Sequence, residues 1–150
     1  VPTKMAFVGS WLFRYLYIDA AGREYTKNFM VEGSFIAAYS AMIHQAPSLM
    51  YIEALEDSEV YEILYADWRM LRKEHPCWNA FLVSMLEKGF CVKEKREREL
   101  LLLDAEERYK IFLQDFPALE HRVKQHLIAS YLGISPVSLS RIRSKPVNIG

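Results

Sequence analysis

The residues best suited to a chemical task lie between positions 125 and 143, where the spacing predicts a helix-turn-helix. Gly133 allows the positive φ that ends a first helix, and Ala129, four residues earlier, is small enough for a second helix to cross closely. Ser135 can cap that second helix, and Pro136 suits its first turn, where a missing N–H costs nothing. The first helix and its exit have an apolar face, formed by Leu127, Ile128, Leu132 and Ile134. A helix presented in this way fits the major groove of DNA.

The expected second helix divides its side chains between the core and solvent. Leu139 and Ile142 are expected to point inward. Four side chains then point outward, namely Val137, Ser138, Arg141 and Arg143. Because every spacing of the motif is met at once, we interpret the segment as a DNA-reading unit. The alternative is an ordinary helical hairpin within a core.

Charge is unevenly distributed along the chain, although the formal net charge is zero. Residues 121–150 contain five basic and no acidic residues, whereas the rest of the chain contains 14 basic and 19 acidic residues. A basic segment beside an acidic body is the electrostatic pattern of a nucleic-acid-binding protein. A solvated basic tail is the alternative, and the adjacent helix-turn-helix favours DNA binding.

Composition argues against several other classes of protein. Cys77 and Cys91 are too few for a disulfide framework, and neither lies in a CxxC pair. No apolar run approaches the roughly 18 residues of a membrane span, and no signal-peptide pattern is present, so we expect a cytoplasmic protein without a membrane partner. The sequence contains no convincing GxSxG, P-loop, HExxH or paired-carboxylate pattern. It therefore predicts no enzyme and no metal site.

Residues 1–65 are predicted to form short β-strands, as in a sandwich or barrel-like roll. The strands are expected near 11–18, 24–31, 35–36, 50–54 and 60–64. Only about five or six strands fit here, so a roll would keep open edges. This shortage, together with the missing initial methionine, predicts a domain truncated at its N-terminus.

Residues 66–103 are predicted to be helical, with a short helix over 67–73 and a long one over about 76–103. In the long helix, apolar residues recur at heptad spacing, at Trp78, Leu82, Met85, Gly89 and Val92. Beyond Lys93 the segment is almost wholly charged, with pairs of opposite sign such as Glu94 and Arg98. We expect the heptad stripe to form a dimer interface. Packing of the stripe against the chain's own β-domain is the alternative, and both can hold at once.

The C-terminal part is predicted to be helical throughout. Asp104 and Glu107 have the spacing of a capping box at the start of a helix that reaches about Gln114. Pro117 interrupts the pattern before a short segment near 118–122 leads into the helix-turn-helix. The predicted fold class is therefore α+β, with a β-roll effector domain at 1–74, a dimerisation helix at 75–103 and a DNA-binding domain at 104–150.

This order of parts resembles the Crp/Fnr superfamily of bacterial transcription regulators. The resemblance covers essentially the whole chain and is strongest over 103–143. Residues 33–36, GSFI, resemble the turn that opens the family's nucleotide cassette, and residues 52–60, IEALEDSEV, resemble its strand pair. Residues 128–143 resemble its operator-reading unit. The resemblance implies a double-stranded β-helix of the cyclic-nucleotide-binding type.

The same resemblance places a ligand pocket at Gly33, Ala37, Ala38, Tyr39, Ser48 and Leu49. Members that bind cyclic AMP hold the ribose with a glutamate where this chain has Ala38. They hold the phosphate with an Arg-Ser pair where it has Ser48 and Leu49. No lysine or arginine lies between Lys27 and Arg69, and an anion buried without a cation is costly. We therefore expect no cofactor and no cyclic AMP bound in the usual way. A more apolar or aromatic effector, or none, remains open. The pocket for such an effector would be lined by Tyr15, Tyr39, Met42 and Tyr51. The alternative is that these side chains belong to the core.

The resemblance also assigns roles on the reading helix. Arg141 matches the family's retained arginine and is expected to contact a guanine edge. Val137 stands where a glutamate is usual, so it is expected to touch a thymine methyl group instead. Phosphate contacts are expected from Lys124, Arg143 and Lys145. With Ser135 and Ser138, these residues complete the predicted DNA-binding set.

The sequence as a whole predicts a homodimeric regulator that binds a near-palindromic operator, with half-sites about 34 Å apart. RNA polymerase is a further candidate partner. An effector in the roll, or its absence, is expected to shift the long helices and a hinge near Leu103 and Asp104. The alternative is an effector-binding or protein-interaction module that has lost operator specificity. Val137 and the lack of room for a wing hairpin after Ser144 favour this alternative slightly.

Overall fold

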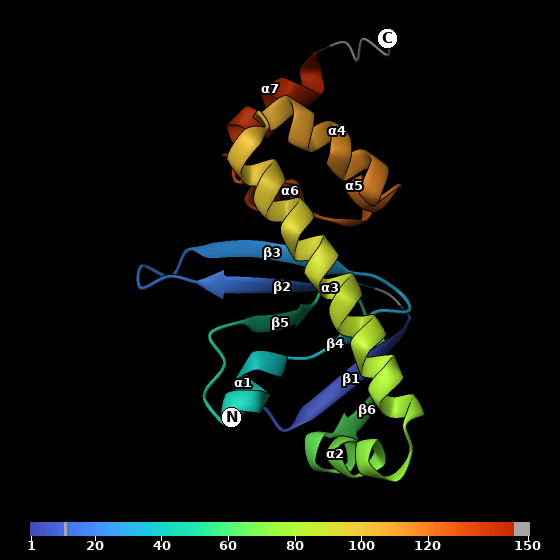
Figure 1. The fold of residues 1–150 in the computed structure, drawn as a ribbon. Helices are drawn as coiled ribbons and strands as arrows, with labels where there is room; N and C mark the ends of the chain where they lie inside the picture. The colour runs from blue at the N-terminus through green and yellow to red at the C-terminus, as the bar shows by residue number, and fades with distance from the viewer. Residues whose placement is uncertain (11, 146–150) are drawn as a thin grey trace.

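The computed structural model describes residues 1–10 and 12–145. Trp11, where the first predicted strand begins, and residues 146–150, at the end of the predicted C-terminal domain, lie outside the described residues. Within the described part the chain is α+β, as the sequence predicts: a β-sheet region interrupted by one short helix is followed by helices (Figure 1). None of the described helices is both long and apolar enough to cross a membrane.

The described strands form two antiparallel sheets with the orders β4-β1-β6 and β3-β2-β5. Their bounds are β1 (Lys4–Ser10), β2 (Phe13–Ile18), β3 (Glu24–Met30), β4 (Phe35–Ile36), β5 (Tyr51–Ala54) and β6 (Glu59–Leu64). Strands β3 to β6 lie within one residue of their predicted ends. Strand β1 was not predicted, because its partners β4 and β6 are distant in sequence and leave no local signal.

Seven helices lie among the described residues. Their bounds are α1 (Tyr39–His44), α2 (Tyr65–Glu74), α3 (Cys77–Leu102), α4 (Ala105–Asp115), α5 (Leu119–Arg122), α6 (Gln125–Leu132) and α7 (Pro136–Ser144). Helix α1 was not predicted, since it is only six residues long and has no side-chain cap. The capping box that begins α4 is confirmed. The N–H of Glu107 donates to the Asp104 carboxylate at 2.9 Å, and the N–H of Asp104 donates back to the Glu107 carboxylate at 2.9 Å.

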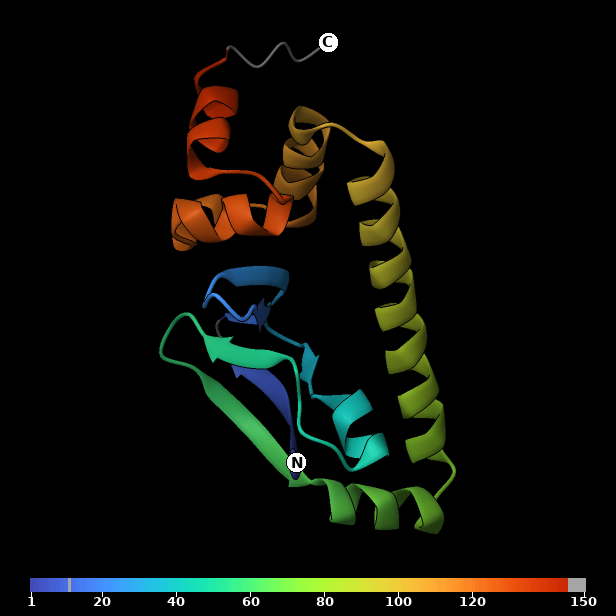
Figure 2. The ribbon, with the colours of Figure 1, turned by 90° about the vertical axis from the view of Figure 1, so that its left-hand side faces the viewer.

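One apolar cluster joins the second sheet to the helical domain. Phe29 of β3 packs against Phe112 of α4 and Tyr131 of α6, with ring centroids 6.2 and 5.4 Å apart. Leu12, before β2, and Leu139 of α7 belong to the same cluster. Figure 2 shows the helical domain stacked on the sheet edge formed by β3, with α3 running alongside both. The sheet and the helical domain thus share a continuous core.

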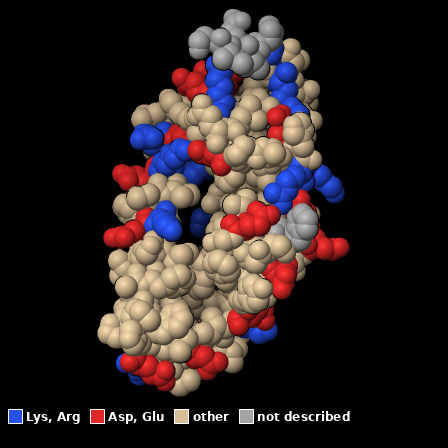
Figure 3. All heavy atoms as spheres, turned by 90° about the vertical axis from the view of Figure 1, so that its right-hand side faces the viewer, with Lys and Arg blue, Asp and Glu red and all other residues tan. Residues whose placement is uncertain are grey.

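The long helix α3 has two apolar faces. Trp78 and Leu82 pack with Met5 of β1 and Trp68 of α2. At these two positions the stripe therefore packs against the chain's own two sheets, β1–β6, which we call the roll, and this is the alternative weighed above. Gly89 and Val92, further along the same stripe, are exposed. The second, neighbouring face carries the exposed side chains Val83, Leu86, Phe90 and Leu101. Figure 3 shows a largely uncharged surface over the first half of α3, between charges at the α2 end and the many charges of the other half of the molecule.

Candidate nucleic-acid interface

The turn between α6 and α7 has the predicted local geometry. Gly133 adopts a left-handed conformation with φ of 69°, and the N–H of Ile134 donates to the carbonyl of Ala129 at 3.0 Å. The Ser135 hydroxyl then accepts the N–H of Ser138 at 3.1 Å, which caps α7. Pro136 occupies the first turn of α7. The predicted glycine end and serine cap are therefore confirmed, and together they fix how α7 leaves α6.

Packing decides which side of α7 faces solvent. Leu139 is fully buried, and Ile142 is half-buried against the same core. Ala129 of α6 is also fully buried, so a small residue stands at the helix crossing, as the sequence predicts. Because these three contacts hold α7 from one side, its opposite side is presented to solvent.

The exposed side of α7 is a stripe of four residues at helical spacing, namely Val137, Ser140, Arg141 and Ser144. Val137 is 61% exposed. Ser138, which was expected to point outward, is half-buried, and its hydroxyl lies 2.9 Å from that of Ser135. Ser140 was missed in the sequence analysis. Its position three residues after Val137 is the signal that could have identified it.

The predicted phosphate-binding residues fall into two groups. Arg143 pairs with Glu120 of α5 at 2.8 Å, and Lys145 pairs with Glu106 of α4 at 2.9 Å. Glu120 also accepts the hydroxyl of Tyr109, and this contact, second to burial, raises the pKa of Tyr109 to about 12. Both cations are thus partly neutralised within the chain.

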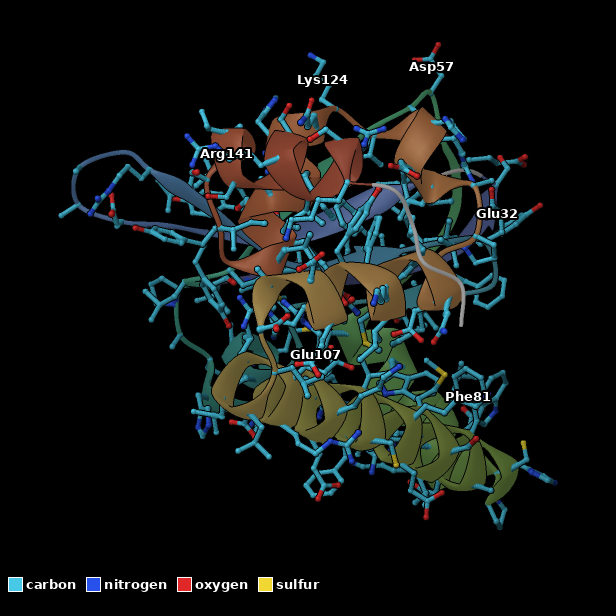
Figure 4. The ribbon with its side chains drawn as sticks, turned by 90° about the horizontal axis from the view of Figure 1, so that it is seen from above. Glu32, Asp57, Phe81, Glu107, Lys124 and Arg141 are labelled. Carbon is cyan, nitrogen blue, oxygen red and sulfur yellow. The ribbon has the colours of Figure 1, made fainter. Side chains whose placement is uncertain are left out.

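Lys124, by contrast, is exposed at the N-terminus of α6. Figure 4 shows Lys124 and Arg141 pointing outward on the side of the helical domain away from α3. The structure therefore brings a basic side chain from the start of α6 to the same side as the exposed stripe of α7.

The serine cap makes a testable contribution to stability. Ser135→Ala removes the acceptor for the N–H of Ser138 and should lower the free energy of unfolding by about 1 kcal/mol. Urea titration followed by circular dichroism measures this change. The control is Ser140→Ala, the same substitution at an exposed site inside α7, which should alter stability by less than about 0.5 kcal/mol. Equal losses in the two variants would contradict the capping role.

Residues of the predicted ligand pocket form hydrogen bonds with other residues of the chain. The N–H of Ala37 donates to the hydroxyl oxygen of Tyr15 at 3.0 Å, and burial raises the pKa of Tyr15 to about 12. The Ser48 hydroxyl donates to the carbonyl of Met50 at 2.7 Å. Ala38 is buried at the start of α1, whereas Leu49 is exposed to solvent. These residues do not fit the phosphate of a cyclic nucleotide, because no lysine or arginine lies between residues 28 and 68.

The remaining pocket residues have structural roles. Gly33 has φ of 77°, and its N–H donates to the carbonyl of Val8 at 3.0 Å. The ring of Tyr39 packs edge-on against that of Tyr65, with centroids 6.3 Å apart. Met42 is fully buried in the cluster that holds α2 and α3 to the roll. The core role weighed for Met42 is therefore the one it has.

Comparison with known proteins relates the whole chain to solved structures. Neither a family model nor a curated protein matches the sequence. FixK2 from Bradyrhizobium japonicum superposes with a TM-score of 0.81 at 18% identity, over 95% of this chain and 73% of that one. The c-di-GMP-responsive global regulator CLP from Xanthomonas campestris gives a TM-score of 0.75 at 18% identity, over 93% and 75% of the two chains.

A third similar structure carries a family description. It is described as a transcriptional regulator of the Crp/Fnr family from Eubacterium rectale, and it matches with a TM-score of 0.75 at 17% identity, over 93% of this chain and 67% of that one. The predicted resemblance is therefore confirmed at the level of the fold. At these identities the likeness concerns the fold alone.

Proposed function

We propose that this chain is a homodimeric DNA-binding transcription regulator of the Crp/Fnr type. The exposed stripe of α7, with Arg141 at its centre, is the observation that carries the proposal. It is held by a capped turn and a packed inner face, so its orientation is fixed before DNA binds. The regulator fold shared with FixK2 and CLP supports the same function.

The side chains of the stripe divide the recognition of DNA between them. Arg141 donates two hydrogen bonds to O6 and N7 of a guanine in the major groove. Val137 contacts a thymine methyl group, and Ser140 lies beside Arg141 within reach of a base or a phosphate. Lys124 binds the backbone, and Arg143 and Lys145 contribute less because each shares its charge with a carboxylate. This division gives Arg141 the largest share of sequence discrimination.

Pairing of two copies places two reading helices on one duplex. The outward face of α3 provides the dimer contact through Val83, Leu86, Phe90 and Leu101. Half-sites then lie about 34 Å apart on a near-palindromic operator. The roll acts as the controlling domain without cyclic AMP, because two residues of its predicted pocket, Ala37 and Ser48, already form hydrogen bonds within the chain.

Selection of bound fragments from random duplex DNA tests the function. The expected result is a common motif with two inverted halves. A binder of the other class weighed from the sequence, an interaction module without operator specificity, would enrich no common motif.

The sharpest variant is Arg141→Ala. At fixed salt concentration it should weaken binding to the selected site about 5- to 150-fold, since a bidentate pair with guanine discriminates by roughly 1–3 kcal/mol. The variant should also discriminate less between the four possible base pairs at the position that Arg141 contacts. Fluorescence anisotropy with matched and mismatched duplexes measures both effects.

Arg143→Ala is the matched control, because it removes the same side chain from the same helix. It should reduce affinity only slightly and equally for all sequences. Unchanged specific binding by Arg141→Ala would overturn the assignment of α7 to the major groove.

A further inference from the structure

Helix α6 closes the open edge of strand β3. Within the described residues β3 is an edge strand, so its outward N–H and C=O groups need partners. The hydroxyl of Ser130 supplies both: it accepts the N–H of Thr26 at 2.8 Å and donates to the carbonyl of Glu24 at 3.2 Å. A single hydroxyl on α6 therefore joins the helical domain to the backbone of the roll.

Arg14 of strand β2 contacts the side chains of the same two residues, Glu24 and Thr26. Arg14 is 3% exposed, and its guanidinium donates to the hydroxyl of Thr26 at 3.3 Å. It also binds the carboxylates of Glu24 and Glu53. Arg14 and Ser130 thus hold the 24–26 segment of β3 together, one through its side chains and the other through its backbone.

The next residue of β2 reaches the turn at residues 33–36 and Ala37 directly after it, which together we call the cassette-like turn. Successive side chains of a strand point to opposite faces, so Tyr15 points away from Arg14. The Tyr15 hydroxyl accepts the N–H of Ala37 at 3.0 Å. The pairing of β2 with β3 has a register shift between Tyr15 and Leu16, and such bulges redirect side chains locally. Strand β2 therefore links the cassette-like turn on one face with the docking site of α6 on the other.

Helix α6 also contacts the long helix α3, through Tyr131 and Arg96. Tyr131, adjacent to Ser130, packs its ring beneath the guanidinium of Arg96, 3.7 Å from the ring centroid. Arg96 donates to the carbonyl of Tyr131 as well, and it lies 3.7 Å from the carboxylate of Glu99, which is 2% exposed. Consecutive residues of α6 are thus fixed to the roll and to the long helix.

We infer that β2 relays the state of the cassette-like turn to the reading helix, through Tyr15, Arg14 and the Ser130 hydroxyl. Any ligand that binds the N–H of Ala37 through an oxygen must displace the Tyr15 hydroxyl. Release of Tyr15 moves β2, disturbs the 24–26 segment and loosens α6, which carries α7 with it. This regulation rests on the proposed function. It runs through the docked sheet edge, in addition to the hinge expected near Leu103 and Asp104.

Hydrogen exchange in the full-length chain without DNA tests the relay in both directions. Tyr15→Phe keeps the ring and removes the hydroxyl, and it should speed exchange of the Thr26 amide about two- to tenfold, the range that follows from the net worth of one hydrogen bond. Ser130→Ala should speed exchange of the Ala37 amide in the same sense, because coupling between two sites is reciprocal. The Tyr65 amide, which donates to the carbonyl of Thr3 at 2.8 Å, reports on general loosening of the roll and should stay unchanged in both variants.

Tyr61→Phe is the matched control for Tyr15→Phe. The Tyr61 hydroxyl is at an exposed position and bonds only to Glu59, at 3.3 Å, among the described contacts. Its removal should leave exchange at Thr26 unchanged. A folded Tyr15→Phe protein with native exchange at Thr26 would overturn the relay, as would equal acceleration at Thr26 and Tyr65. If Tyr15→Phe does not fold, exchange at Ala37 in Ser130→Ala decides the matter.

The two proposals fail in different ways. A protein that binds no DNA but shows linked exchange at Ala37 and Thr26 would refute the proposed function and leave the relay intact. A protein that selects an operator but shows no such linkage would refute the relay alone.

Discussion

Replacing Phe90 by glutamate is expected to convert the proposed dimer into a monomer and to weaken binding to a two-fold operator at least about 100-fold. The size of the loss follows from avidity, since two linked reading helices gain about 100- to 10,000-fold over one. Phe90 is 66% exposed in the single chain, the largest exposure of an aromatic side chain on α3. A carboxylate there would have to be buried without a partner when two copies of the helix meet.

The position of Phe90 on α3 supports its place in the contact. At 100° per residue, Val83, Leu86 and Phe90 lie on one face, about a quarter turn around the helix from Trp78 and Leu82, which the roll already covers. Three of the four residues that line an open hollow of about 440 Å³ are Leu86, Phe90 and Cys91, and Glu87 is the fourth. Side chains of a facing helix can insert into this hollow. The face that the chain leaves uncovered is therefore the one available to a second copy.

Sedimentation velocity measures the dimer, and anisotropy with full and half operators measures the loss of affinity. The matched control is Ser84→Glu, which adds the same charge to the same helix on its lateral side. It should remain dimeric and bind as the parent protein does. A dimeric Phe90→Glu protein would show that the contact lies elsewhere, for example at the exposed positions Gly89 and Val92 of the predicted stripe.

Short-range signals predicted the elements of the reading unit well. Gly133, Ser135 and the Asp104–Glu107 box act on backbone groups within four residues of themselves, so their spacing alone specifies the structure. The short helix α1 carries no such signal. For β1, the decisive contacts lie about 55 residues away, in a register such as Met5 with Ile63. Long-range pairing of this kind depends on the assembled roll.

Other site features depend on which face a helix or strand turns inward. The stripe from Trp78 to Val92 and the stripe through Phe90 are both apolar, so periodicity identifies two faces of α3 without choosing between them. The same limit applies to Arg143, which the sequence presents as a free cation. Folding places it beside Glu120, 23 residues earlier in the chain. The occupation of the Ala37 N–H by Tyr15 is likewise a product of the tertiary fold.

The second large effect is expected from Phe112→Ala, which should lower the free energy of unfolding by about 3–5 kcal/mol. Phe112 is 1% exposed and stands at the centre of an aromatic cluster. Its ring centroid lies 5.6 Å from those of Phe116 and Tyr131 and 6.2 Å from that of Phe29. Truncation therefore removes buried apolar contacts and leaves a cavity that rigid neighbours cannot fill.

The position of the cavity determines how the protein should unfold. Phe29 belongs to the roll and Tyr131 to α6, so Phe112 supports the contact through which Ser130 reaches β3. Urea titration followed separately by circular dichroism and by exchange of the Thr26 amide should show the contact opening before the roll unfolds. The control is Phe7→Ala on β1, where the ring is 40% exposed and the loss should be less than half as large. A Phe112→Ala protein that keeps a single coincident transition at the parent midpoint would contradict the shared core. If the contact opens early, DNA affinity should fall with it, because α7 is then oriented by the hinge after α3 alone.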